Sequence, residues 1–146
     1  NSKSWELIDS SGFFSHHVWL DDENLLAYLE HHNKNRFCIW NKKDGWSKGN
    51  SSMPLTDGHP SVISKNGKII LDCYPNRLGK MSLYLASTNQ KQSLKEMGYV
   101  MNTPQYTGPI RCDLHPRFSN NHSKVVCDIP SKIGRRILII EGNYAE

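Results

Sequence analysis

The sequence of 146 residues lacks several features that mark common classes of protein. No stretch approaches the roughly 20 apolar residues that a membrane-spanning helix needs, so we expect no membrane partner. The four cysteines, at positions 38, 73, 112 and 127, form no C-x-x-C pair, which disfavours a zinc ribbon or a redox motif and favours reduced thiols. A G-x-S-x-G motif is absent, which disfavours a serine hydrolase. Helical periodicity is missing nearly everywhere, so the chain is expected to consist of strands.

Concentrated charge is lacking too. The chain has 18 Lys and Arg against 14 Asp and Glu, a net charge of +4, but the basic residues are scattered. Proteins that bind nucleic acid concentrate such charge in a patch or stripe, so we expect no nucleic-acid partner. A mild positive charge suits acidic ligands such as uronate sugars. The first twenty residues contain no apolar run of the signal-peptide kind, and the compartment stays open between cytoplasm and periplasm.

The strongest positive signal is an internal repeat. The segment His59–Asp72, HPSVISKNGKIILD, aligns without a gap with His115–Asp128, HPRFSNNHSKVVCD, and the His, Pro, Lys and final Asp are identical. The match continues as PNRLGK, residues 75–80, against PSKIGR, residues 130–135. A weaker third copy begins at His16. Repeats of roughly 40 to 50 residues that are built of short strands are typical of β-propellers.

The second copy shows how each repeat is divided into strands. Strands are expected at 61–63 and 68–73, and the dipeptide Asn66-Gly67 between them is a hairpin signal. Further strands are expected at 81–86 and 94–101. We therefore predict an all-β chain, a β-propeller of four-stranded antiparallel blades with about three blades. Residues 1–146 would form a single partial propeller domain, with blades at roughly 13–56, 57–108 and 109–146.

These repeats resemble the TolB-like and oligogalacturonate-lyase-like propellers, in which the first two strands carry a pattern like H-P-x-W-S-P-D-G-K. The pattern stands here as His59-Pro60-Ser61-Val62 with Asn66-Gly67-Lys68, and again at residues 115–119. The segments 57–61 and 72–75 are most similar to the lyase-like branch. Two departures are that the Pro-Asp-Gly turn is degraded and that the Q-x-x-H-x-H metal cluster of the lyases has no counterpart.

The resemblance covers roughly residues 13–142 and implies a ring of six or seven blades. Three blades alone would leave large apolar faces in water, which stable soluble proteins rarely do. The remaining blades of a longer chain, or a second copy in a homodimer, would then complete the ring.

The repeat also predicts where a site would lie. In a propeller, the segment before the innermost strand and the loop between the second and third strands lie at the same end of the blade. We therefore expect His16, His59 and His115 to converge at the mouth of the central channel. Converging imidazoles can bind a borderline divalent metal ion, and manganese or zinc would suit this set.

A metal ion at that point would polarise the carboxylate of a uronate and make the neighbouring C–H more acidic, so that β-elimination could follow. Polar residues that do not repeat are the better candidates for such chemistry. The expected catalytic residues are Arg77, Arg111 and Asp113, and the expected contacts to an acidic oligosaccharide or small ligand are Arg117, Tyr74 and Trp46.

Other interpretations stay open. A histidine repeated in each blade can be structural, and Asp72 and Asp128 are expected to hold the turns that follow them. The protein is a uronate lyase, a non-catalytic propeller that binds a glycan or small ligand, or a protein-interaction module of the TolB type. Bound metal separates the first two, and an exposed apolar patch near the channel mouth is expected of the third.

Overall fold

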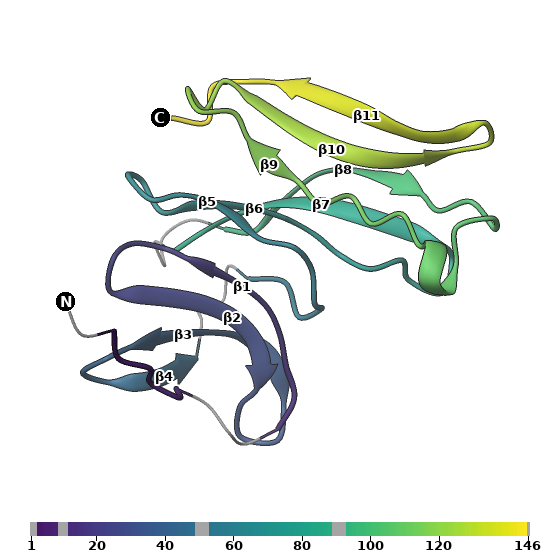
Figure 1. Cartoon of the computed structure of the whole chain (residues 1–146). Helices are drawn as coiled ribbons and strands as arrows, with labels where there is room; N and C mark the ends of the chain where they lie inside the picture. Colours follow the sequence, from purple (N-terminus) through teal and green to yellow (C-terminus); the bar gives the residue numbers. More distant parts are fainter. Residues whose placement is uncertain (1–2, 9–11, 49–52, 89–92, 146) are drawn as a thin grey trace.

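The computed structural model describes residues 3–8, 12–48, 53–88 and 93–145. These residues form three antiparallel sheets, with the second sheet packed between the first and the third (Figure 1). The first sheet contains β1 (Phe14–Trp19), β2 (Asn24–Glu30), β3 (Asn35–Asn41) and β4 (Gly45–Lys48). The second contains β5 (Ser61–Ile63), β6 (Lys68–Asp72), β7 (Lys80–Ser87) and β8 (Lys95–Met101). The third contains β9 (Arg117–Phe118), β10 (Lys124–Ser131) and β11 (Gly134–Glu141). The all-β expectation is confirmed.

The strands of each sheet pair in chain order, as in a meander. The hairpin between β5 and β6 closes at Gly67, whose φ of 65° lies in the left-handed region that glycine adopts without strain. A 3-10 turn, η1 (Gly108–Ile110), precedes the third sheet. Within the described residues, no helix has the length and apolar character needed to cross a membrane.

Two hydrophobic cores hold the three sheets together. Between the first and second sheets, Leu26, Phe37 and Ile69 are buried in one cluster. Between the second and third sheets, Ile70 and Val125 are buried in another. Because successive side chains on a strand point to opposite faces, Ile69 and Ile70 serve different cores, and the second sheet is buried on both faces. The innermost strand β5 contacts β1 on one side and β9 on the other.

The outer faces of the first and third sheets are less well covered. On the third sheet, Val126, Ile137 and Ile139 share the face turned away from the second sheet, and all three are exposed. On the first sheet, Trp19 is exposed on the corresponding outer face. Trp5 is 96% exposed in the described structure. Both outer faces therefore carry exposed apolar side chains in the described structure.

All four cysteines are buried, and Cys73, Cys112 and Cys127 are reduced thiols. Burial raises the pKa of Cys73 to about 11 and that of Cys127 to about 12, because a thiolate is poorly solvated there. The thiolate is the reactive form, so both side chains are chemically protected.

We expect Cys73 and Cys127 to react slowly with a disulfide reagent at about pH 8 in the native protein, because their raised pKa values keep the thiols neutral. Unfolding in guanidinium chloride should release both to rapid reaction. Peptide mapping by mass spectrometry assigns the label to each cysteine. Rapid labelling of either residue in the native state contradicts the burial described for it.

Candidate functional site

The three repeated histidines lie in a row across the inner edges of the three sheets. His16 lies in β1, His59 lies shortly before β5, and His115 shortly before β9. The ring centroids of His16 and His59 are 4.1 Å apart, and those of His59 and His115 are 3.9 Å apart. The pairing of β1 with β2 is irregular between Phe14 and His17, and such bulges re-aim side chains. We call His16, His59 and His115 the histidine row.

Asp72 holds the centre of the row in place. It is the last residue of β6 and is only 2% exposed. Its carboxylate accepts hydrogen bonds from the backbone N–H of His59 (2.6 Å) and from that of His115 (3.0 Å). The same carboxylate lies 3.0 Å from Nδ1 of His59. One buried side chain therefore connects the second sheet to the third.

The charge of Asp72 is stabilised by these contacts. Burial alone would raise its pKa, but the hydrogen bonds and the charge interaction with His59, together with the backbone N–H of His115, outweigh burial and hold the pKa of Asp72 below its ordinary value. Because an ionised carboxylate only accepts hydrogen bonds, each N–H group around it has a suitable partner.

The backbone is adapted to this arrangement. A Cβ atom at Gly58 would overlap the backbone carbonyl of Asp72, so a residue with a side chain does not fit beside the end of β6. His115 has a φ of 42°, in the left-handed region that is unfavourable for a residue with a side chain. Such strain persists where the surroundings enforce it, here through the N–H bond to Asp72 and through the fully buried Pro116.

Each histidine of the row has an oxygen acceptor beside Nδ1. The partner is the Asp57 carboxylate for His16 (3.1 Å), the Asp72 carboxylate for His59 and the backbone carbonyl of Asp113 for His115 (3.2 Å). An oxygen at Nδ1 selects the tautomer that is protonated there, because the carbonyl or carboxylate only accepts. The hydrogen-bond network therefore assigns the lone pair of each neutral ring to Nε2.

Tyr74 and Arg111 border the row. The Tyr74 ring lies 5.9 Å from the His16 ring and 5.7 Å from the His59 ring, centroid to centroid. The guanidinium of Arg111 lies over the Tyr74 ring at 4.6 Å, and its Nε donates to both carboxylate oxygens of Asp113, at 2.6 and 2.7 Å. The hydrogen bond from Arg111 to Asp113 raises the pKa of the arginine, and burial raises the pKa of Tyr74.

The structure thus brings together six of the residues selected from the repeat and its flanks: His16, His59, His115, Tyr74, Arg111 and Asp113. Asp128 lies at the margin, 3.9 Å from Nδ1 of His115. The other three predicted residues lie outside this group. Arg77 is exposed in the turn between β6 and β7. Arg117 is exposed on β9 and donates to the backbone carbonyl of Pro116.

Trp46 lies on the outer strand of the first sheet. It packs against the cluster of Ala27, Leu29 and Cys38, and its indole N–H donates to the backbone carbonyl of Ile8. These contacts fix Trp46 on the outer face of the first sheet, away from the histidine row.

Asp57 is the site residue that the sequence interpretation missed. Besides contacting His16, its carboxylate accepts hydrogen bonds from the Ser15 hydroxyl (2.8 Å) and from the Gly58 backbone N–H (2.8 Å). A signal for it was present in the sequence, because an aspartate precedes both His59 and His115 by two residues, as Asp57 and Asp113. Each of these aspartates lies beside a histidine of the preceding blade.

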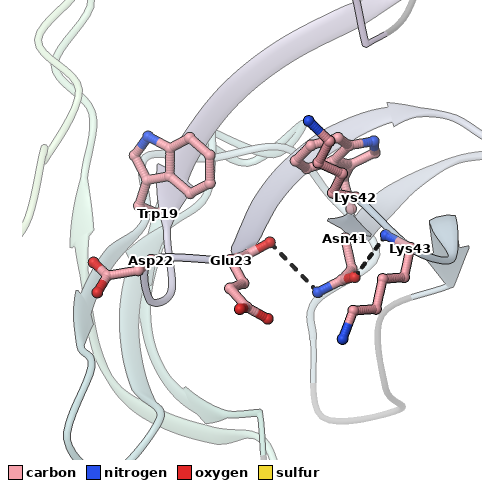
Figure 2. A pocket seen from close by; sticks show the side chains of 7 residues that line it. Trp19, Asp22, Glu23, Asn41, Lys42 and Lys43 are labelled. Carbon is pink, nitrogen blue, oxygen red and sulfur yellow. Dashed lines mark hydrogen bonds between the residues drawn. The ribbon is translucent and has the colours of Figure 1, made fainter.

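A pocket of about 360 Å³ lies elsewhere, and Trp19 and Trp40 are among the residues that line it. Figure 2 shows Asp22, Lys42 and Lys43 around it as well. Trp19 and Trp40 are both paired with Leu25 of β2, so they share the outer face of the first sheet. The pocket therefore lies on the outer face of the first sheet and contains none of the residues of the histidine row.

Comparison with known proteins establishes the fold. No family model and no curated protein matches the sequence. Among solved structures, TolB from Acinetobacter baumannii superposes with a TM-score of 0.63 at 11% identity, over 91% of this chain and 31% of that chain. A protein of unknown function from Bacteroides thetaiotaomicron VPI-5482 superposes with a TM-score of 0.59 at 10% identity, over 92% of this chain and 30% of that chain. The chain therefore has the fold of part of a TolB-like β-propeller and spans about a third of the length of these neighbours.

The repeat provides a matched pair of aspartates with which to test the role of Asp72. We expect Asp72→Asn to lower the free energy of unfolding by about 2–4 kcal/mol, because the amide nitrogen cannot accept the buried N–H bonds. Asp128, the repeat counterpart, has a side chain that is 52% exposed, and Asp128→Asn should change stability by less than about 0.5 kcal/mol. Urea denaturation followed by circular dichroism measures both. Equal effects of the two substitutions would show that Asp72 has no special role.

Proposed function

We propose that this chain is the ligand-binding part of a TolB-like propeller, and that it binds the acidic group of a uronate-type oligosaccharide or a similar small ligand beside the histidine row. The observation that carries this proposal is the position of Arg111. Its Nε is engaged by Asp113 and its plane lies over Tyr74, so the guanidinium is held in one orientation. Within the described part of the chain, the terminal nitrogens stay available for a bidentate pair with a carboxylate.

Tyr74 and the histidines complete the proposed binding surface. The raised pKa of Tyr74, which burial causes, keeps its hydroxyl protonated, and the hydroxyl oxygen can accept a hydrogen bond from a sugar hydroxyl. β-Elimination would in addition require a base within hydrogen-bond reach of the C–H next to the carboxylate. In the ion-free protein, the Nε2 atom of His59 or of His115 is the group suited to that role, so a uronate lyase is the catalytic form of this proposal.

A protein-interaction module is the second candidate, favoured by one observation. Three connecting segments at the end that carries the histidine row each expose a large aliphatic side chain: Leu78 between β6 and β7, Ile110 in η1, and Ile133 between β10 and β11. Exposed apolar side chains grouped around a site are typical of protein-binding surfaces. A peptide would then bind beside the histidine row in place of a sugar.

We propose that further blades of a longer chain cover the outer faces of the first and third sheets. The exposed Val126, Ile137 and Ile139 support this, as does the fraction of the neighbours' length that the chain spans. A homodimer that closes the ring from two sets of three blades is the alternative, and sedimentation of the protein separates the two.

Binding of galacturonate oligosaccharides, measured by calorimetry, tests the proposed function. We expect the wild type to bind galacturonate oligosaccharides and not to bind neutral galactose oligosaccharides. Arg111→Lys should weaken binding by about 10-fold or more, since lysine keeps the charge beside Asp113 but cannot form the bidentate pair. The ultraviolet absorbance of an unsaturated product would report elimination in the same samples.

Arg77→Lys is the matched control, because Arg77 is exposed and lies outside the group around the histidine row. Its binding constant should stay within about twofold of the wild type. The proposal is wrong if the wild type does not discriminate galacturonate from galactose, or if both substitutions weaken binding equally. Binding of apolar peptides in place of sugars would favour the protein-interaction module.

A further inference from the structure

The fixed charges around the histidine row do not balance. Three carboxylates lie within or beside it, those of Asp57, Asp72 and Asp113, and Arg111 is the cation paired with one of them. Asp72 and Asp113 are buried, and the Asp57 side chain is only 14% exposed, so water screens their charge poorly. An acidic ligand would meet this negative potential as well as Arg111. A bound cation would remove the conflict.

The row also contains a set of groups that can coordinate such a cation. His59, Asp113 and His115 each offer one ligand atom, and these atoms lie within 4.8 Å of one another. Ligand atoms around a zinc ion at about 2.1 Å are separated by roughly 3.4 Å, so the three side chains would need to approach by about 1 Å. The His115 side chain is 42% exposed and has room to make that movement.

The hydrogen bonds of the two histidines match those of known metal ligands. Metal-binding histidines usually donate the other ring N–H to a carboxylate or to a backbone carbonyl, which fixes the ring and its tautomer. His59 has the Asp72 carboxylate at Nδ1, and His115 has the Asp113 carbonyl there. In both rings Nε2 is the nitrogen left for coordination.

We propose that His59, His115 and the Asp113 carboxylate bind a divalent transition-metal ion through two imidazole nitrogens and one oxygen, with Asp72 as the positioning residue of His59. This ligand set suits zinc or manganese. Three coordinating side chains leave coordination positions of the ion open, and one of these positions receives the acidic group of the bound oligosaccharide or small molecule. The identity of this acidic group rests on the proposed function. The ion site itself does not depend on the proposed function.

The site differs from the three histidines that the repeat predicts as ligands. Nδ1 of His16 faces Asp57, and its Nε2 lies 3.4 Å from the Tyr74 hydroxyl, so both ring nitrogens have a partner within the protein. Asp113 takes the third ligand position in its place. His16 becomes the packing neighbour of His59.

The experiment uses protein stripped with a chelator and titrated with Zn²⁺ alone and with Mn²⁺ alone by calorimetry. Co²⁺ serves as a spectroscopic probe, since its visible absorption reports coordination directly. We expect one equivalent of ion per chain. His115→Ala and Asp113→Asn should weaken binding on the order of 100-fold, because each removes or neutralises a ligand. These two positions are preferred to His59, whose replacement disturbs the buried bond to Asp72.

His16→Gln and His122→Ala are the controls, each a histidine outside the proposed ligand set. His122 lies in the turn before β10 and tests for adventitious surface binding. Both should bind the ion within about threefold of the wild type, with unchanged circular dichroism. The site is refuted if the wild type binds no stoichiometric ion, if His115→Ala and Asp113→Asn bind normally, or if His16→Gln weakens binding as much as His115→Ala.

A second titration, of galacturonate with and without the ion, separates this inference from the proposed function. Weaker galacturonate binding in the presence of chelator supports an ion that receives the acidic group. Equal binding with and without chelator overturns that role and leaves the proposed function intact. An ion bound as expected, with no galacturonate binding in either condition, refutes the proposed function and leaves the ion site standing.

Discussion

The buried carboxylate of Asp72 is the interaction on which the rest of the site depends. It accepts the backbone N–H groups of His59 and His115 and orients the His59 ring, so it joins the end of β6 to the segments that precede β5 and β9. Its place requires a glycine at position 58 and a strained backbone at His115. Buried polar networks of this kind are stable only when each member is satisfied. The geometry of the row is therefore a property of the packing between sheets, and not of any one blade.

A second regularity runs from blade to blade. The aspartate two residues before each repeated histidine lies next to the histidine of the preceding blade: Asp57 contacts His16, and the Asp113 carboxylate lies close to His59. Each junction between blades therefore places a carboxylate beside an imidazole. The two junctions then diverge, because Asp113 also holds Arg111 whereas Asp57 is held by Ser15 and Gly58. That divergence makes the second junction the functional candidate, since it combines a fixed cation with open imidazole nitrogens.

Much of this was predictable from sequence, for identifiable reasons. The strands of the second blade follow from short apolar runs and from Asn66-Gly67, which are local signals, and β5 to β8 match the expected ranges with small shifts at their ends. The histidine row follows from the repeat, because equivalent positions lie at the same end of each blade. The contrast between Asp72 and Asp128 was not predictable, because the first is buried between two sheets and the second faces solvent. The positions of the Trp46 and Asp57 side chains likewise depend on contacts with other segments of the chain, namely with Ile8 and with His16.

The central claim is that oxygen acceptors at Nδ1 orient the three histidines and leave Nε2 of His59 and of His115 open. Long-range ¹⁵N–¹H correlation NMR of the metal-free protein, at about pH 8.5 where a free imidazole is neutral, reads the tautomer of each ring directly. The account predicts the Nδ1-protonated tautomer for His16, His59 and His115. Protonation of Nε2 in His59 or His115 would contradict it, because the lone pair would then face Asp72 or the Asp113 carbonyl and the site would have no open nitrogen to offer.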